Sequence, residues 1–496
     1  MRERCRCAVW CATALAVVYG CGFGGDASVP PNIVMIVLDT ARPEYTSAYG
    51  HPRPTTPFLE TFAEQGTRFE RAYSSSCWTL PAHVALFTGA PSSAHGVDQL
   101  TTVLRDDVPV LAEQLAETGY QTAAFTGNQW ITEKTGLARG FQHFKNCATG
   151  AYGAWIRALA ADRQARAIRP AEHYVVGWVL DWIENTLRSD EPFFLFVNLV
   201  DPHTPYLPDG PSARPFFDSP KDRWQTIQRI FPGSRQDILI EHVAGRHKIG
   251  EAEQRELSRL YEGALRLTDS LTRAIIRAVD RAVEPADTLI FILSDHGENL
   301  GDHDLYAHSF NLYDSNLRIV LMARGPGFSA GSMDPRPVHI TDVYATILAA
   351  AGLVVPAASE AVDLRGEIPR DRVLTASLSY PKISIESLRN RVPDERFDPF
   401  RVELAAAIAD GFKLLRRSDV SGQIVTEVLY DLSGDPDELH PLRADEVDTQ
   451  LLERLRASLP RPRRVVLNDA TSTEQLSMDA EQLEALRALG YVGDDD

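Results

Sequence analysis

The sequence of 496 residues is 44% hydrophobic and 24% charged. These proportions are typical of a folded globular protein and argue against a disordered chain, while the length predicts one large domain and a smaller one. The net charge of −18 argues against nucleic acid as a partner, because a phosphate backbone binds clustered lysine and arginine.

The first twenty residues predict an export signal. Arginine-rich residues 2–6 precede an apolar stretch, Cys7 to Tyr19, which is too short for a permanent membrane span. The following Gly20-Cys21 and the glycine-rich linker to residue 30 resemble a bacterial lipobox, in which the cysteine becomes the lipidated first residue. We therefore expect an exported lipoprotein of the periplasm or cell envelope that begins at Cys21 and contacts membrane only through this anchor. An ordinary cleaved signal peptide is the alternative.

Six cysteines are present, and three of them lie in the predicted signal. If Cys21 carries a lipid, Cys77 and Cys147 remain to form a disulfide in an oxidising compartment. Two unpaired buried thiols are the alternative.

Three apolar runs predict central strands of a mostly parallel sheet. They span residues 32–39, 192–198 and 287–295, and runs without polar alternation are typical of strands buried on both faces. Helices are predicted at 57–65, which begins with proline and is followed by glycine, and at 108–118, also followed by glycine. Alternating strands and helices predict an α/β fold with a large wound sheet between helices. Ligands of such folds bind beyond the carboxyl ends of the strands, where Asp39, Asp201 and Asp295 fall.

The rest of the chain predicts insertions and a second unit. Residues 152–188 and 207–280 are helix-rich and polar, which is typical of insertions near a site. Residues 401–418 and 423–438 predict short strands joined by turns, and therefore a small antiparallel sheet. We expect a catalytic domain at 31–352, a smaller C-terminal α+β subdomain at 353–460 and a tail at 461–496.

Acidic and histidine side chains gather in a few short segments. Asp295-His296 follows a predicted strand, and a turn at Gly297 lets both side chains converge on one cation. Asp39, at another strand end, supplies a further oxygen. Mixed carboxylate and imidazole ligands suit Mn²⁺ or Zn²⁺ better than an all-oxygen Ca²⁺ site. An Asp-His pair taken alone is also consistent with a turn cap.

A hydroxyl group precedes a predicted helix in "WTLPAH", residues 78–83. Pro81 is suited to the first turn, so Thr79 is expected just before the helix N-terminus, where backbone N–H groups and the helix dipole favour an anion. Thr79 is a candidate nucleophile once it is deprotonated. The same position also favours a helix N-cap hydroxyl, and the pattern does not separate the two.

Several segments resemble, in the expected order, blocks of the sulfatase family of the alkaline-phosphatase superfamily. They are "NIVMIVLDTARPEYTSAYG", "RPTTPFLETFAEQGTRFERAYS", "TLPAHVALFTG", "LVDPHTPY", "SDHGENLGDHDLYAHSFNLYDSNLRIVLMARGPG", "HITDVYATILAAAGL", "VLYDLSGDPDE" and "LRALGYVG". The resemblance covers nearly the whole mature chain. It implies an alkaline-phosphatase-like fold and a metal-dependent ester hydrolase.

One block departs from the sulfatase signature C-x-P-S-R, whose cysteine becomes formylglycine. Here the stretch reads T-L-P-A-H, so Thr79 occupies the nucleophile position, His83 replaces the arginine, and formylglycine is not expected. Threonine at this position resembles phosphoethanolamine transferases and lipoteichoic acid synthases of the same superfamily. That resemblance implies one divalent metal ion (Mn, Zn or Ca, with Mn or Zn favoured) bound by Asp39, Thr79, Asp295 and His296.

The resemblance also assigns further residues of the pocket. His203 resembles the histidine that contacts the transferred group or the leaving oxygen, and His308 stands where sulfatases often carry a substrate-binding lysine. Together with His83, these are the predicted catalytic histidines. Asn128 and His303 are predicted to contact substrate. Thr40 replaces a second aspartate of many sulfatases, which weakens a Ca²⁺ assignment.

These observations predict an exported hydrolase of sulfuric, phosphoric or phosphonate esters that works through a covalent threonyl ester. A phosphate-type substrate is favoured because a sulfated threonine lacks the easy collapse of a formylglycine hemiacetal. The substrate is expected to be a small molecule or a glycan or lipid ester. A transferase to a lipid or sugar hydroxyl is one alternative, and a degenerate family member that only binds a ligand is another.

Overall fold

The computed structural model describes residues 30–146, 173–231, 238–239, 242, 245–356, 359–388 and 399–465. The predicted export signal with Cys21, the cysteine at 147, most of the first predicted insertion and nearly all of the predicted C-terminal tail lie outside these residues.

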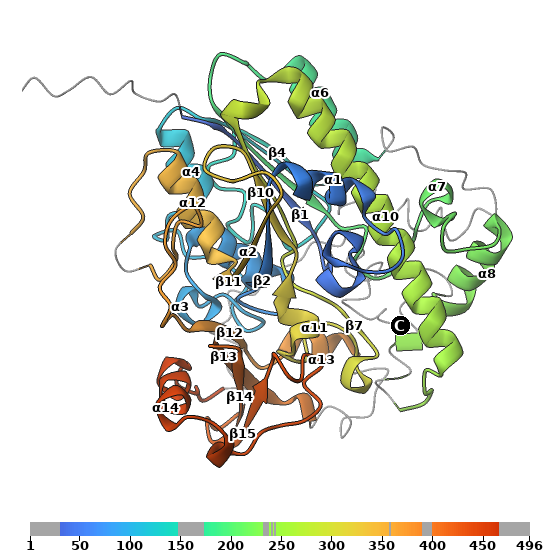
Figure 1. Cartoon of the computed structure of the whole chain (residues 1–496), viewed down its shortest axis with the longest axis vertical. Helices are drawn as coiled ribbons and strands as arrows, with labels where there is room; N and C mark the ends of the chain where they lie inside the picture. Colours follow the sequence, from blue (N-terminus) through green and yellow to red (C-terminus); the bar gives the residue numbers. More distant parts are fainter. Residues whose placement is uncertain are drawn as a thin grey trace, which may run out of the picture.

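A mixed sheet runs through the centre of the molecule (Figure 1). Within the described residues it has nine strands in the order β11-β2-β10-β6-β1-β5-β3-β4, with β9 beside β2. The strands are β1 (Asn32–Leu38), β2 (Thr67–Tyr73), β3 (Gln121–Thr126), β4 (His143–Asn146), β5 (Phe193–Leu199), β6 (Thr288–Leu293), β9 (Arg318–Ile319), β10 (Leu321–Arg324) and β11 (Ser332–His339).

The three strands predicted from apolar runs lie side by side. β1 pairs in parallel with β5 on one side and with β6 on the other. Val37, near the end of β1, is in register with Asn198 and Leu293, near the ends of its neighbours. The segments that begin at Asp39, Val200 and Ser294 therefore leave the sheet at the same edge, as predicted.

Side chains of β1 alternate between two hydrophobic cores. Val34 and Ile36 pack with helices on one face, and Ile33 and Met35 pack with helices on the other. The first face is covered by α1 (Pro57–Gln65), α6 (Tyr174–Asn185) and α10 (Glu251–Ala282), and the second by α2 (Thr79–Thr88), α4 (Leu111–Glu117) and α12 (Thr341–Ala350) (Figure 1). Burial on both faces explains why these strands carry no polar alternation.

The two predicted helices form, with one corrected boundary. α1 spans the predicted residues 57–65, and the Asp269 carboxylate of α10 accepts the backbone N–H groups of Phe58 and Leu59 at its N-terminus. α4 begins at Leu111 rather than at Val108. The predicted start was wrong because Val108 precedes a proline, which disfavours helical backbone at that residue.

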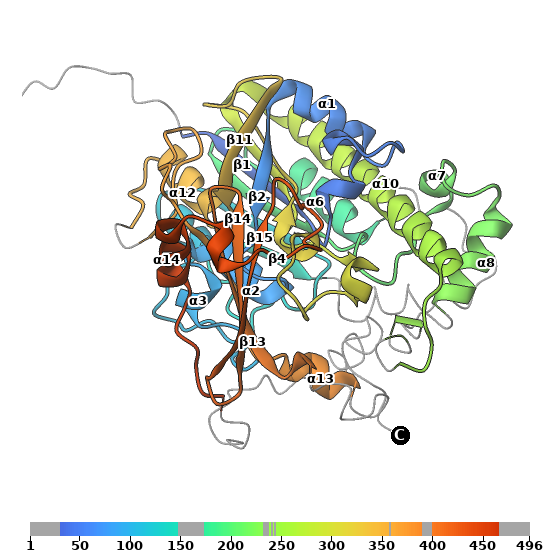
Figure 2. The same ribbon diagram turned by 60° about the horizontal axis from the view of Figure 1, so that its bottom comes forward.

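The predicted antiparallel sheet is present at the C-terminal end of the described chain (Figure 2). β12 (Leu374–Leu378), β13 (Val402–Ala409), β14 (Phe412–Asp419) and β15 (Ile424–Asp431) pair in sequence, and α14 (Thr449–Ser458) packs on β13 and β14. The buried Lys413 of β14 forms ion pairs with Asp314 and Glu438 at 2.7 and 2.6 Å. This sheet is thereby tied to the segment that follows β8.

The remaining elements are short or peripheral. They are α3 (Ser92–His95), α7 (Gly210–Ala213), α8 (Pro220–Ile230), α11 (Asp314–Leu317), α13 (Lys382–Leu388), β7 (Asn299–Leu300) and β8 (Tyr306–Ala307), with 3-10 turns at Pro43–Tyr45, Ser47–Tyr49, Pro285–Asp287, Asp302–Asp304 and Ala444–Glu446. In the described part of the chain, no helix combines the length and the apolar character that crossing a bilayer requires.

Candidate active site

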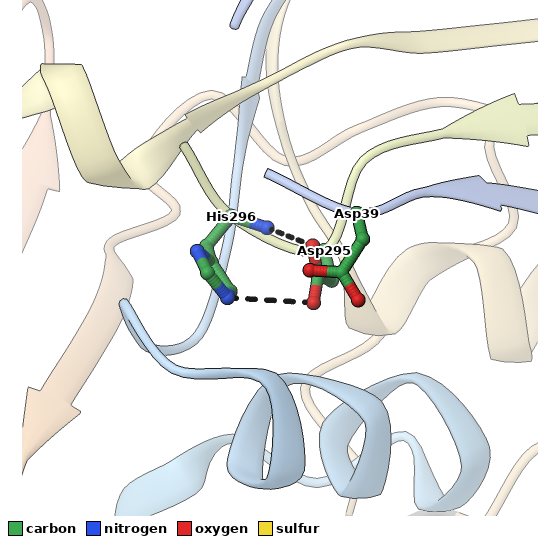
Figure 3. Close-up of side chains that lie close together, drawn as sticks. All are labelled: Asp39, Asp295 and His296. Carbon is green, nitrogen blue, oxygen red and sulfur yellow. Dashed lines mark hydrogen bonds and ion pairs between the residues drawn. The ribbon is translucent and has the colours of Figure 1, made fainter. Parts of the chain in front are cut away.

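Asp39, Asp295 and His296 point toward one another at the carboxyl edge of the sheet (Figure 3). One candidate ligand atom from each residue lies within 4.8 Å of the other two, and all three side chains are buried. Asp39 directly follows β1, and Asp295 and His296 follow β6 by two and three residues. The predicted convergence of these side chains is therefore present.

Each carboxylate is held by one oxygen and leaves the other without a partner. Asp39 Oδ2 accepts hydrogen bonds from Asn128 Nδ2 at 2.8 Å and Asn198 Nδ2 at 3.2 Å. Asp295 Oδ1 accepts the backbone N–H groups of Thr40 at 3.1 Å and His296 at 2.9 Å. Asp39 Oδ1 and Asp295 Oδ2 are buried and have no hydrogen-bond partner among the described residues. Burial raises the pKa of Asp295 to about 7, and burial together with the nearby Asp295 raises the pKa of Asp39.

A hydrogen bond to the backbone orients the imidazole of His296. Its Nδ1 donates to the Gly297 carbonyl at 2.8 Å, which leaves Nε2 with a lone pair 3.4 Å from Asp295 Oδ2. Two unpartnered buried oxygens and one nitrogen lone pair thus face a common point. This donor set fits a divalent ion, and the outer hydrogen bonds fix each ligand as metal sites require.

The turn after Asp295 depends on a close backbone approach. A Cβ atom on Gly297 would lie 2.0 Å from the Ser315 carbonyl oxygen, so a larger residue cannot occupy this position without displacing the chain. The predicted turn at Gly297 is present, and the close approach of the Ser315 carbonyl gives a steric reason for glycine there.

Thr79 lies inside the helix rather than before it. Trp78 is the N-cap of α2, with extended backbone and no side-chain cap bond, and Thr79 is the first helical residue. The Thr79 hydroxyl lies 3.4 Å from His296 Nε2 and 3.4 Å from Asn128 Nδ2. The N-cap interpretation of Thr79 is therefore wrong, because the hydroxyl faces the candidate metal ligands instead of the backbone of its own helix.

His83 lies one helical turn after Thr79 and contacts its backbone. Its Nδ1 donates to the Thr79 carbonyl at 2.8 Å and lies 3.6 Å from Asp295 Oδ2. Burial lowers the pKa of His83 to about 4, so the ring is neutral at pH 7. His83 thus contacts the backbone of the candidate nucleophile Thr79 and lies beside the candidate ligand Asp295.

His203 and His308 complete a cluster of three imidazole rings. The His308 ring centroid lies 4.9 Å from that of His203 and 4.7 Å from that of His296. His308 Nδ1 donates to Glu298 Oε1 at 3.0 Å, and burial raises the pKa of Glu298 to about 7. Burial, followed by the nearby His203, lowers the pKa of His308.

Two residues of this site escaped the sequence interpretation. Asn198 lies within an apolar strand, where nothing marked it as a site residue, and Glu298 lies among other polar residues of a loop. Their roles depend on hydrogen bonds to Asp39 and His308, which the fold brings within reach. The acidic position between the Asp-His pair and His308 is the signal that points to Glu298.

Other residues highlighted by the sequence lie apart from the cluster. His303 stacks on Tyr313 with ring centroids 3.6 Å apart, and both line a cavity of about 410 Å³ beside Arg42 and Asp302. Its predicted contact with substrate stays a prediction. Among the described residues Cys77 has no disulfide partner, and its predicted pairing with Cys147 lies outside them. Cys77 is buried, and burial raises the pKa of its thiol to about 12.

Comparison with known proteins identifies relatives that match most of the chain. The sulfatase family model matches residues 31–353. Arylsulfatase K of Mus musculus is 23% identical over 467 residues, which cover 87% of this chain and 80% of that protein. The structure of the phosphonate monoester hydrolase of Agrobacterium radiobacter matches with a TM-score of 0.66 at 21% identity, covering 86% of this chain and 95% of that one. A second solved structure, a complex with its substrate D-glucosamine-2-N,6-O-disulfate, matches with a TM-score of 0.64 at 18% identity and covers 86% and 96% of the two chains.

Proposed function

The chain belongs to the sulfatase family and is an ester hydrolase, and from this premise we propose that Thr79 is its nucleophile and that phosphate-type esters are its favoured substrates. The observation that carries the proposal is the position of the Thr79 hydroxyl. It lies 3.4 Å from His296 Nε2 and 3.4 Å from Asn128 Nδ2. His296 Nε2 is in turn 3.4 Å from Asp295 Oδ2, and Asn128 Nδ2 donates to Asp39, so both contacts connect the hydroxyl to the candidate ligands.

The residues that would hold the metal are Asp39, Asp295 and His296, with the Thr79 hydroxyl as a fourth ligand. When bound, a divalent ion supplies positive charge that favours loss of the hydroxyl proton and offsets the negative charge of the transferred group. Mn²⁺ or Zn²⁺ is proposed over Ca²⁺ because His296 offers nitrogen and Thr40 replaces a possible carboxylate.

The first step is in-line attack of Thr79 Oγ1 on phosphorus. A bond forms between Oγ1 and phosphorus, the bond from phosphorus to the leaving alcohol oxygen breaks, and the Thr79 proton passes to solvent. Backbone N–H groups at the start of α2 stabilise the oxygens of the transferred group. His203, or His308 once it has taken up a second proton beside Glu298, donates a proton to the leaving alcohol.

The second step is attack of water on the threonyl ester. A new bond forms between water oxygen and phosphorus, and the bond to Thr79 Oγ1 breaks. The water proton passes to the histidine that gave its proton to the alcohol, and Thr79 Oγ1 takes up a proton from solvent, which restores the threonine hydroxyl and the starting enzyme. A sulfate ester of threonine must break by the same attack, because threonine has no geminal hydroxyl through which it can collapse. This is the reason for proposing phosphate or phosphonate esters over sulfates.

Two neighbours of Thr79 are proposed to keep it in position. Asn128 donates to Asp39 and lies beside the Thr79 hydroxyl, and the His83 ring holds the Thr79 carbonyl. Through these contacts both residues fix the direction of the attacking oxygen rather than transfer protons themselves.

The test is activity of the purified protein, loaded with Mn²⁺ or Zn²⁺, on aryl phosphate monoesters, diesters, phosphonates and sulfates. We expect Thr79→Ala to lower turnover on the order of a thousandfold or more. Acid quenching of the wild type during turnover should trap the threonyl ester. Mass spectrometry should then find the mass of a phosphoryl group added to the peptide that contains Thr79. Thr88→Ala, at the other end of α2, and Cys77→Ala are the controls. Full activity of Thr79→Ala with loss of activity in Cys77→Ala contradicts the assignment, and turnover of sulfates alone contradicts the substrate preference.

Export is proposed from the N-terminal sequence, with Cys21 as the lipidated residue. Fractionation of cells that express the full chain should place the protein in the envelope. Cys21→Ala should abolish the lipid mass and release the protein from membranes, and a cytoplasmic location of the wild type contradicts the proposal.

A further inference from the structure

A tyrosine hydroxyl of α10 binds the backbone of residues 40–42, which connect Asp39 to the 3-10 turn Pro43–Tyr45. Tyr261, in the buried face of α10, donates its hydroxyl proton to the Thr40 carbonyl at 2.7 Å. The Tyr261 hydroxyl oxygen also accepts the backbone N–H of Arg42 at 2.9 Å. One side chain of α10 thus satisfies two buried backbone groups immediately after the candidate ligand Asp39.

This turn needs an external fastening because its backbone is unfavourable. Thr40 has a φ of +60°, a left-handed conformation that a β-branched residue adopts at a cost. Its backbone N–H donates to Asp295 Oδ1 at 3.1 Å, so the strained residue connects the two candidate carboxylate ligands. A relaxed Thr40 loses the orientation of this N–H, and Asp295 loses one of the two bonds that fix its carboxylate.

The direction of the Tyr261 hydroxyl is itself fixed by packing. The Tyr261 ring packs in T-shaped geometry against the rings of Tyr45 and Tyr206, at centroid distances of 5.3 and 5.2 Å. Tyr206 belongs to the segment that carries His203. Replacing the tyrosine by phenylalanine keeps these ring contacts and removes the hydroxyl alone.

We propose that Tyr261 is a positioning residue for the metal site, acting through the Thr40 turn on the relative placement of Asp39 and Asp295. The inference rests on the proposed metal-dependent function. It assigns to α10 a direct share in metal affinity in addition to its part in the hydrophobic core.

The test compares Tyr261→Phe with Tyr120→Phe in the whole purified protein. Tyr120 is a matched control, because it is also buried and its hydroxyl donates to the Pro31 carbonyl at 3.0 Å, at the opposite end of β1 from Asp39. Free Mn²⁺ is measured by electron paramagnetic resonance during titration, and the urea midpoint is measured without metal. We expect Tyr261→Phe to bind Mn²⁺ about 10- to 100-fold more weakly, which is the usual effect of removing a group that orients a metal ligand. The Mn²⁺ affinity of Tyr120→Phe should stay within about twofold of the wild type.

A rescue variant tests the strain argument and covers the case that Tyr261→Phe does not fold. Glycine adopts a φ of +60° without strain. Thr40→Gly in the Tyr261→Phe background should therefore raise the urea midpoint again and recover part of the Mn²⁺ affinity. Unchanged Mn²⁺ affinity in Tyr261→Phe, equal losses in the two tyrosine variants, or no recovery in the double variant overturns the inference. A wild-type protein that binds neither Mn²⁺ nor Zn²⁺ overturns the metal site itself, and the inference with it.

Discussion

Replacing Lys413 by methionine should destabilise the protein in a pH-dependent way. The Lys413 ammonium is fully buried, lies 2.7 Å from Asp314 Oδ1 and 2.6 Å from Glu438 Oε1, and donates to the Leu312 carbonyl at 3.2 Å. Burial alone lowers the pKa of Lys413, but the two carboxylates outweigh it and the pKa is raised. The lysine is therefore a cation in the folded state.

The magnitude follows from what the substitution leaves behind. Methionine fills similar space but leaves the buried Glu438 and the partly buried Asp314 without their cation, and loss of one partner from a buried pair costs about 3–5 kcal/mol. Because two partners are affected, we expect about 4–5 kcal/mol at pH 8. The variant escapes part of this cost by binding a proton at Glu438, whose pKa burial already raises.

The sign of the pH dependence follows from that proton. In the variant the folded state binds a proton that the unfolded state, with an ordinary carboxyl pKa, does not bind at pH 5–8. The unfolding free energy of the variant therefore rises as the pH falls, by about 1.4 kcal/mol for each pH unit. Burial already raises the pKa of Glu438 in the wild type, so only the further rise caused by loss of the cation separates the two proteins. We therefore expect the difference from the wild type to be smaller at pH 5 than at pH 8.

Urea unfolding followed by circular dichroism at pH 8 and pH 5 measures both quantities. Lys248→Met, at an exposed lysine, is the control and should change the unfolding free energy by less than about 0.5 kcal/mol. A loss below 1 kcal/mol for Lys413→Met at pH 8, or a loss that does not shrink at pH 5, refutes the reasoning.

Two further predictions concern the site and the helix that carries Thr79. Burial lowers the pKa of His95 to about 4 while its Nε2 donates to the Pro81 carbonyl and its Nδ1 accepts the Val97 N–H. Between the unfolded pKa near 6.5 and this value the unfolded chain binds a proton that the folded chain does not, so stability present above pH 6.5 is lost as the pH falls. The difference in unfolding free energy between the wild type and His95→Gln should therefore shrink by about 3 kcal/mol from pH 7.5 to pH 4.5. A difference that stays constant contradicts this. Gly297→Ala should lower both the thermal midpoint and Mn²⁺ affinity, because the new Cβ meets the Ser315 carbonyl at 2.0 Å. In Gly366→Ala the nearest atom lies at 3.5 Å, so equal behaviour of the two variants contradicts the steric explanation.

Local patterns in the sequence identified the centre of the fold and three candidate metal ligands, whereas the family resemblance added the surrounding histidines and Asn128. Continuous apolar runs predicted β1, β5 and β6, because strands covered on both faces cannot carry polar alternation. The same runs placed Asp39 and Asp295 at the ends of parallel neighbours, and these ends share an edge of the sheet. Residue type and position thus sufficed to bring the candidate ligands together.

Helix starts were predicted less well, because they depend on individual backbone angles. The sequence could not decide whether Thr79 is a cap or a reactive hydroxyl, since serine and threonine favour both places. In the folded chain Trp78 takes the N-cap position and turns the Thr79 hydroxyl toward His296. That outcome depends on the packing of α2 against the strand ends.

The sequence by itself determined which strands are central and which side chains stand at their ends, because burial on both faces and turn chemistry leave local patterns. Only the tertiary structure decided the partners of those side chains. Asn198 holds Asp39, Glu298 holds His308, and Tyr261 holds the turn at Thr40 from more than two hundred residues away. A hydrogen bond between distant residues requires a distance and an angle that packing of whole elements sets, and no periodicity along the chain records either.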